Sequence, residues 1–122
     1  VLVVDDSQTV REALAHVLAK SGFAVDVAGD GVEAWNLLRE ADYAALVTDL
    51  EMPRMDGIAL IEKARADEVA VGLAIVAITS RDSRQSRERA QEVGADRLLS
   101  KPIDPKQIVE VLFSLLSRDG SK

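Results

Sequence analysis

The sequence lacks cysteine, and it lacks any long hydrophobic run. Without cysteine the chain forms no disulfide and no thiolate metal site, so the reducing cytoplasm is the compartment we expect. No apolar segment approaches the roughly 18 residues of a membrane-spanning helix. The first residues have neither the positive flank nor the cleavage site of a secretory signal. These absences predict a cytoplasmic protein that does not act in a membrane.

Basic residues are outnumbered, with 15 lysines and arginines against 21 acidic residues and a net charge of −6. A direct nucleic-acid ligand is therefore not expected, because phosphate backbones are bound by basic surfaces. The acidic excess lies in residues 1–61, which contain 11 acidic and four basic side chains. Acidic chemistry is thus expected in the first half of the chain.

The length of 122 residues fits one domain with a substantial core. The chain does not start with methionine, and it begins inside a strand-like pattern. We therefore expect it to be one domain of a longer protein.

Short apolar runs alternate with segments of helical periodicity along the chain, which is typical of βαβ units around a parallel sheet. The run at 73–78 is the most apolar, and we expect it at the centre of the sheet. The sequence predicts an α/β fold with a five-stranded parallel, doubly wound sheet and five helices. The expected strands are 1–4, 23–28, 44–49, 73–78 and 97–100; the fourth helix is expected at 84–93, and the last begins after Asp104.

Polar side chains stand where four of these runs end. Asp5 and Asp6 follow the first run, and Asp49 ends the third. Thr79 follows the fourth run and Lys101 follows the fifth. Each alone has an ordinary explanation as a helix cap, a turn residue or a solvated charge. Together they would meet at the carboxyl edge of the sheet, where they suit a hard cation such as Mg²⁺ and a phosphoryl group.

Six short motifs occur in order along the chain: Val3-Val4-Asp5-Asp6-Ser7, Asp30-Gly31, Thr48-Asp49-Leu50-Glu51-Met52-Pro53-Arg54-Met55-Asp56-Gly57, Ala77-Ile78-Thr79, Gly94-Ala95-Asp96 and Lys101-Pro102. In identity and spacing they resemble the receiver domain of bacterial response regulators. The resemblance implies the (βα)5 flavodoxin-like receiver fold over 1–118, with a tail at 119–122. The stretches around Asp49 and at 5–12 are most similar to receivers fused to chemotaxis-type hybrid histidine kinases.

The resemblance also implies the chemistry of the acidic residues. Asp49 would be the phosphoacceptor, taking a phosphoryl group from the phosphohistidine of a kinase. Asp6, Asp49 and the main-chain carbonyl of Glu51 would bind Mg²⁺ directly. Asp5 would act mostly through metal-bound water.

The remaining site residues follow from the same resemblance. Lys101 would hold a phosphoryl oxygen and form a cis peptide bond with Pro102, and Thr79 would be the switch hydroxyl. The family usually has Tyr or Phe three residues before the lysine, whereas this chain has Leu98. A leucine has no phenol with which to move between a solvated and a buried state. We therefore expect a shallower conformational response than in receivers with an aromatic residue there.

Two charged residues flank the site, Glu51 two positions after Asp49 and Arg81 two positions after Thr79. In the family these positions tune the loss of the phosphoryl group. We expect Glu51 and Arg81 to pair across the mouth of the site. The alternative is that both are solvated charges, since surface pairs contribute only about 0–1 kcal/mol.

The helix expected at 84–93 is rich in arginine and has a thin apolar face, with Ala90 and Val93 alone. One interpretation is a basic surface that docks an acidic partner or another domain. The other is an ordinary solvated helix face. Weak burial would make this segment one of the easier ones to shift.

The expected partner is a histidine kinase or a phosphotransfer domain, either in another protein or in the same polypeptide. No nucleic acid, membrane or small-molecule substrate beyond phosphodonors is expected, and no enzymatic activity beyond the domain's own phosphorylation and dephosphorylation. The main alternative is a degenerate receiver that acts as an unphosphorylated interaction module, which Leu98 keeps open. A dehalogenase-type phosphatase would need a cap and a substrate pocket. A flavin carrier would be repelled by the acidic pair Asp5 and Asp6.

Overall fold

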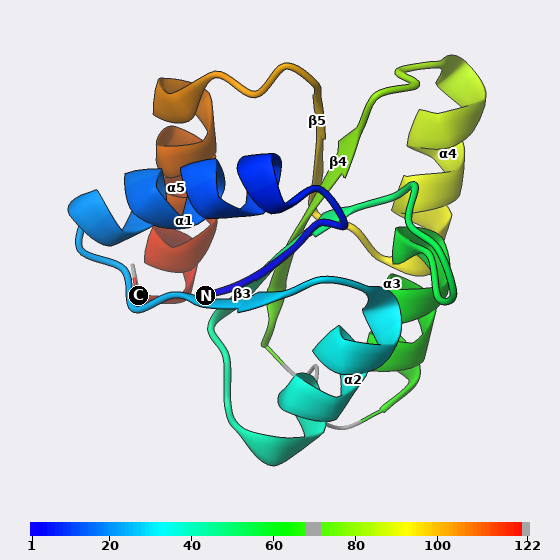
Figure 1. Ribbon diagram of the computed structural model, residues 1–122, viewed down its shortest axis with the longest axis horizontal. Coiled ribbons are helices and arrows are strands. Elements are labelled where there is room, and N and C mark those ends of the chain that lie inside the picture. Colours follow the sequence, from blue (N-terminus) through cyan, green and yellow to red (C-terminus); the bar gives the residue numbers. More distant parts are fainter. Residues whose placement is uncertain (68–71, 121–122) are drawn as a thin grey trace.

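The computed structural model describes residues 1–67 and 72–120. Strands and helices alternate from one end to the other, as the sequence predicted (Figure 1). The strands are β1 (Leu2–Val4), β2 (Asp26–Ala28), β3 (Ala45–Asp49), β4 (Ala74–Thr79) and β5 (Arg97–Ser100). The helices are α1 (Gln8–Lys20), α2 (Gly31–Glu40), α3 (Gly57–Ala66), α4 (Arg84–Val93) and α5 (Pro105–Gly120).

All five described strands are parallel and form one sheet in the order β2-β1-β3-β4-β5. The predicted α/β fold with a doubly wound parallel sheet is therefore confirmed. The expectation that the fourth strand is central was wrong, because β3 is the middle strand. Every residue of β3 and of β4 is buried. Since both are interior strands covered on both faces, apolar content cannot tell which one is in the middle.

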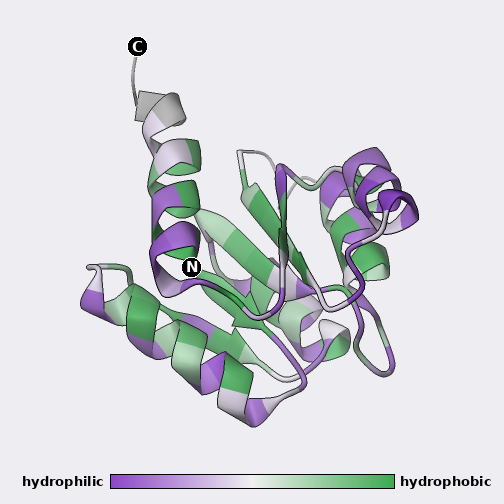
Figure 2. Ribbon diagram, turned by 90° about the horizontal axis from the view of Figure 1, so that it is seen from above, coloured by the Kyte–Doolittle hydropathy of each residue, from purple (hydrophilic) through white to green (hydrophobic). Residues whose placement is uncertain are grey.

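The helices form two layers, with α1 and α5 on one face of the sheet and α2, α3 and α4 on the other (Figure 1). Successive strand residues point to opposite faces, so Leu2 and Val4 pack under α2 to α4 while Val3 packs under α1 and α5. The colouring of Figure 2 shows the same division, with hydrophobic strands enclosed by helices of mixed character. Both faces of the sheet are thus apolar, so polar side chains are left to the ends of the strands.

All five described helices begin with a side chain that accepts a hydrogen bond from a backbone N–H in the first turn, which satisfies one otherwise unpaired donor. The first is Ser7, whose hydroxyl accepts from the N–H of Val10 at 3.3 Å. Asp30, Asp56 and Ser83 begin α2, α3 and α4 in the same way. At α5 the expected cap Asp104 accepts from the N–H of Lys106 at 3.0 Å. These caps fix the helix starts beside the carboxyl ends of the strands.

Strand boundaries differ from expectation mainly at β2, which covers Asp26–Ala28 and not the whole of 23–28. Among the described strands it pairs with β1 alone, whose three residues pair with these three. Phe23 instead lies against the ring of Phe113 on α5, with centroids 5.1 Å apart. The first half of the expected segment keeps a backbone contact, from the Val1 ammonium to the Ala24 carbonyl at 2.8 Å, and is also anchored by side-chain packing on α5.

At the other end of the chain, α5 reaches Gly120. Part of the tail expected at 119–122, residues 121–122, lies outside the described residues. None of the helices in the described part of the chain is long and apolar enough to cross a membrane.

Candidate functional site

The polar residues predicted to meet at the carboxyl edge of the sheet do so. Asp5 follows β1, Asp49 ends β3 and Thr79 ends β4, and all three are buried. Lys101, directly after β5, extends its side chain into this group. Its Nζ lies 3.2 Å from a carboxylate oxygen of Asp49 and 3.2 Å from one of Asp5. The peptide bond between Lys101 and Pro102 is cis, as the resemblance implied.

Asp49 is 2% exposed, and this burial raises the pKa of its carboxyl group. The neighbouring charge of Asp5 raises this pKa further, while Lys101 and the N–H of Glu51 lower it. The N–H of Glu51 donates to Asp49 at 3.2 Å. The net direction is upward, so the ionised carboxylate is less favoured here than it is in water.

Lys101 is held in its charged form by the same pair of acids. Burial alone would lower the pKa of its ammonium group, but the nearby carboxylates of Asp49 and Asp5 outweigh burial and raise that pKa. The lysine is therefore a fixed cation at this edge of the sheet.

Asp5 is fully buried, yet one of its carboxylate oxygens lacks a hydrogen bond. Its Oδ1 accepts from the N–H of Ser7 at 2.8 Å, and Arg11 donates to its main-chain carbonyl at 2.8 Å. Its Oδ2 has only the nearby charge of Lys101 and accepts no hydrogen bond in the described structure. A buried carboxylate oxygen that accepts no hydrogen bond is suited to contact a cation, or a water molecule that a cation binds.

The three acids form a group that could hold a metal ion. One carboxylate oxygen from each of Asp5, Asp6 and Asp49 lies within 4.8 Å of the others. Asp6 is exposed, which leaves the group open to solvent on one side. All-oxygen ligation by carboxylates, with room for water, is what Mg²⁺ prefers. The residues present therefore fit a hard divalent cation.

The Thr79 hydroxyl does not point to Asp49 but donates to the carboxylate of Glu51 at 2.7 Å. The same carboxylate accepts from the N–H of Ser80 at 3.1 Å and from its hydroxyl at 3.2 Å. The ion pair expected between Glu51 and Arg81 is absent. Among the described residues, no carboxylate lies within ion-pair distance of the Arg81 guanidinium. Sequence reasoning missed the contact between Glu51 and Thr79. In the sheet Asp49 pairs with Ile78, and this register brings the residues that follow each of them close together.

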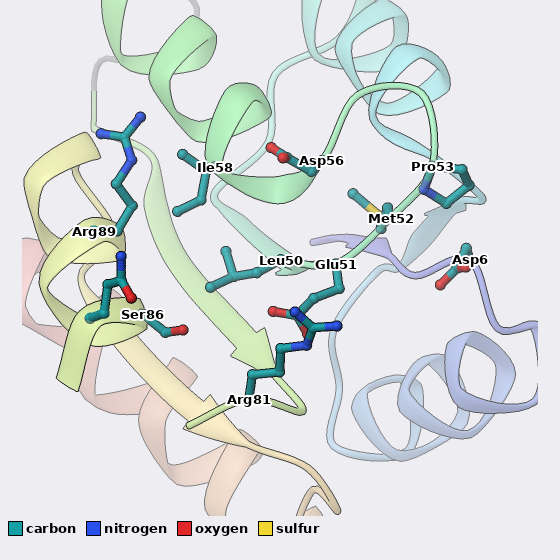
Figure 3. A pocket seen from close by; sticks show the side chains of 11 residues that line it. Asp6, Leu50, Glu51, Met52, Pro53, Asp56, Ile58, Arg81, Ser86 and Arg89 are labelled. Carbon is teal, nitrogen blue, oxygen red and sulfur yellow. The ribbon is translucent and has the colours of Figure 1, made fainter. Parts of the chain in front are cut away.

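A groove of about 830 Å³ opens beside these residues, between the loop after β3 and α4 (Figure 3). Leu50, Met52 and Ile58 give it apolar surface, and charged residues from both sides surround them. Figure 3 shows the Arg81 side chain extending toward Glu51. The full lining is Asp6, Leu50, Glu51, Met52, Pro53, Asp56, Ile58, Arg81, Gln85, Ser86 and Arg89.

The loop between β3 and α3 is tied to the start of α2. Asp30 forms an ion pair with Arg54, and the pKa of Asp30 is lowered by the N–H of Glu33 and then by Arg54. Arg54 has a φ of +66°, in the left-handed region. Gly31 faces the backbone of Met55 so closely that a Cβ would lie 2.3 Å from its carbonyl oxygen. Sequence reasoning did not pair Asp30 with Arg54, because they are far apart along the chain.

The arginines of α4 are paired with acids. Arg84 lies 3.1 Å from Glu88, Arg87 lies 3.4 Å from Asp82, and Arg89 lies 3.7 Å from Glu92. This favours the solvated-face interpretation over a basic docking surface. The thin apolar face is confirmed, since Ala90 and Val93 are the buried residues of the helix.

Leu98, at the position where the family usually has an aromatic residue, is half-buried on β5. It packs against the core under α2 to α4 and stands beside Ala77 of β4.

Comparisons with known proteins agree with this geometry. The family model described as the response regulator receiver domain matches residues 1–113. The response regulator Rre1 of Synechocystis is 36% identical over 118 residues, covering 96% of this chain and 51% of that protein. The chemotaxis protein CheY4 of Vibrio cholerae superposes with a TM-score of 0.90 at 30% identity, covering 94% of this chain and 96% of that one. A Burkholderia pseudomallei response regulator, solved with a phosphorylated aspartic acid, a calcium ion and citrate, has a TM-score of 0.83 at 28% identity and covers 98% of this chain and 69% of that one.

The chain belongs to the response regulator receiver domain family of two-component signalling. Its fold is that of the CheY-like receivers. It spans about half the length of the curated relatives it matches. Receiver domains of this family interact with histidine kinases or phosphotransfer proteins.

Proposed function

We propose that this domain is a phosphoacceptor in a two-component phosphorelay and that Asp49 receives the phosphoryl group. The observation that carries the proposal is the placement of Asp49. Its carboxylate is 2% exposed at the end of the middle strand, 3.2 Å from the Lys101 ammonium and beside two further acids. The phosphorylated aspartic acid in the Burkholderia pseudomallei relative supports the same chemistry.

In the proposed reaction a carboxylate oxygen of Asp49 attacks the phosphorus of a phosphohistidine. The new oxygen–phosphorus bond forms as the phosphorus–nitrogen bond breaks. The imidazole leaves with the electron pair and takes up a proton. The product on this chain is an aspartyl phosphate, and later attack by water restores the carboxylate and releases inorganic phosphate.

The other residues of the site would stabilise the charge of the transferred group. Asp6, Asp49 and the main-chain carbonyl of Glu51 would hold Mg²⁺, with Asp5 acting through water. When bound, Mg²⁺ supplies positive charge that offsets the repulsion between the carboxylates and the transferring group. Lys101 would hold one phosphoryl oxygen, and Thr79 would donate a hydrogen bond to another.

Phosphorylation would switch protein–protein interactions and not a reaction on a small molecule. The chain spans about half the length of the curated relatives it matches, and the output would be another protein or another part of the parent chain. The motif around Asp49 supports a chemotaxis-type hybrid kinase as the parent protein, with the phosphodonor in the same polypeptide. The absence of cysteine suits the cytoplasm.

The test is intact mass after incubation with Mg²⁺ and a small phosphodonor such as acetyl phosphate. The native domain should gain one phosphoryl group, and the gain should disappear in Asp49→Asn and after chelation of Mg²⁺. Asp42→Asn, which changes an exposed acid outside the site, should be phosphorylated like the native domain. Failure of the native domain to gain mass would favour the alternative, an unphosphorylated interaction module.

A further inference from the structure

The Glu51 carboxylate already occupies the Thr79 hydroxyl, the donor that the proposed function assigns to the phosphoryl group, together with the Ser80 donors beside it. It accepts from the Thr79 hydroxyl at 2.7 Å, from the Ser80 N–H at 3.1 Å and from the Ser80 hydroxyl at 3.2 Å. All three donors lie at the end of β4, on the strand next to the one that carries Asp49. Glu51 is thus bound to the segment that would respond to phosphorylation.

A hydroxyl has one proton, so Thr79 cannot donate to Glu51 and to a phosphoryl group at the same time. Its oxygen also accepts from the N–H of Arg81 at 2.9 Å, which fixes the orientation of the group. We propose that Glu51 competes with the phosphoryl group on Asp49 for the Thr79 hydroxyl and the Ser80 N–H, and thereby favours the unphosphorylated conformation. This inference rests on the proposed function and adds a positioning role for Glu51.

The loop after β4 is held separately on its other side. Asp82 accepts from the Ser100 hydroxyl at 2.5 Å and lies 3.4 Å from Arg87. These contacts do not involve Glu51. The segment can therefore exchange the Glu51 carboxylate for a phosphoryl group while its attachment to β5 and α4 is kept. Such an exchange between two arrangements is the requirement for a switch.

Glu51 also carries a negative charge near Asp49, and its removal could strengthen anion binding by simple electrostatics. The two explanations differ in their dependence on Thr79. If Glu51 acts by engaging the hydroxyl, its removal has less effect in a variant that has no hydroxyl. If it acts through charge alone, the effect is the same with and without the hydroxyl.

The experiment is a double-mutant cycle read out by affinity for fluoroberyllate, a phosphoryl mimic, in the presence of Mg²⁺. Glu51→Ala should tighten binding about tenfold, the equivalent of one hydrogen bond to a charged acceptor. In a Thr79→Val background the gain should fall below about threefold, because the Ser80 donor alone remains. Equal gains in both backgrounds, or no gain in either, would overturn the proposal. Glu62→Ala removes an exposed acid of α3 and should leave the affinity unchanged.

A second measurement needs no phosphoryl mimic. In the unphosphorylated protein, hydrogen exchange at the Ser80 amide should be about tenfold faster in Glu51→Ala and unchanged in Glu62→Ala. An unchanged rate in Glu51→Ala would overturn the competition even if the domain is phosphorylated normally. If the native domain binds no fluoroberyllate, the proposed function fails, and the exchange rates still decide whether Glu51 holds this segment.

Discussion

Gly57 faces Asp49 so closely that a Cβ atom on the glycine would lie 2.2 Å from the Asp49 carbonyl oxygen. The same Cβ would lie 2.8 Å from the Cα of Leu50, and the Gly57 N–H donates to the Leu50 carbonyl at 3.0 Å. The obstacles are backbone atoms, which cannot rotate away as a side chain can. The start of α3 is thus set directly against the end of β3.

We predict that Gly57→Ala destabilises the domain by about 1–3 kcal/mol or more, because β3 and α3 must separate. The measurement is the free energy of unfolding in urea. Gly29→Ala is the matched control, since its Cβ would approach only the end of the Arg11 side chain, at 3.3 Å, and then Glu33. Equal losses in the two variants would show that the close approach to Asp49 is not the cause.

The acidic group predicts a dependence of stability on Mg²⁺. An ion that binds the folded state alone stabilises it, by about 2.7 kcal/mol at one hundred times its dissociation constant. Asp6→Asn should lose most of this increment without harming the fold, because Asp6 is exposed. The stabilisation is measured by thermal unfolding with Mg²⁺ and with chelator. The control variant Asp42→Asn should keep the full increment. Loss of the increment in both variants would point to net charge and not to a site.

The positions of the site residues could be predicted because they depend on a local pattern. Four of the five apolar runs end in a polar residue or are followed by one, and parallel strands share a carboxyl edge, so Asp5, Asp49 and Lys101 are expected to meet there. The bounds of α4 were also predicted correctly. Ser83 caps its first turn, and Gly94 ends it with a φ of +113°, a conformation that favours glycine.

Other features depend on interactions that the local pattern does not contain. Strand order is one, since β3 and β4 are both buried and either could be central. The direction of the Glu51 side chain is another. From the sequence Arg81 was the obvious partner by charge, yet the Thr79 hydroxyl is nearer once the two strands are paired in register. A charge pattern indicates possible partners, whereas the backbone geometry selects among them.

Arg65 joins the end of α3 to the turn after α4. Its guanidinium donates to the Gly94 carbonyl at 3.0 and 2.9 Å, to the Leu73 carbonyl at 2.9 Å and to Asp96 at 3.1 Å. We predict that Arg65→Lys costs about 1–3 kcal/mol in free energy of unfolding, because an ammonium cannot reproduce this planar set of donors. Arg39→Lys, at an exposed position of α2, should change stability by less than about 0.5 kcal/mol. A negligible change in Arg65→Lys would mean that water replaces these contacts.

Tyr43 is the single tyrosine of the chain, and its hydroxyl donates to Asp26 at 2.6 Å. Burial, followed by this hydrogen bond and the charge of Asp26, raises the pKa of Tyr43 from 10.0 to about 12. The folded state therefore holds this proton more tightly than the unfolded state does. The resulting stability is fully present below pH 10 and is lost as the pH rises toward about 12.

Tyrosinate absorbance against pH measures this directly. The pH at the midpoint of the titration should lie well above that of an ordinary tyrosine in the folded domain. Asp26→Asn should lower this midpoint. A native midpoint near the ordinary value would show that the contact with Asp26 is not kept in solution.

Leu98 predicts how far a phosphoryl signal spreads through the domain. It is half-buried beside Ala77 and packs on the core under α2 to α4, and it has no polar group to exchange between water and the interior. We predict that fluoroberyllate with Mg²⁺ changes amide chemical shifts strongly near Thr79 and only weakly along β5 and α5. In Leu98→Tyr the changes along β5 should grow, because a phenol can respond to movement of the hydroxyl. Large changes across β5 and α5 in the native domain would refute the shallow response and show that an aliphatic side chain at this position is enough to carry the signal.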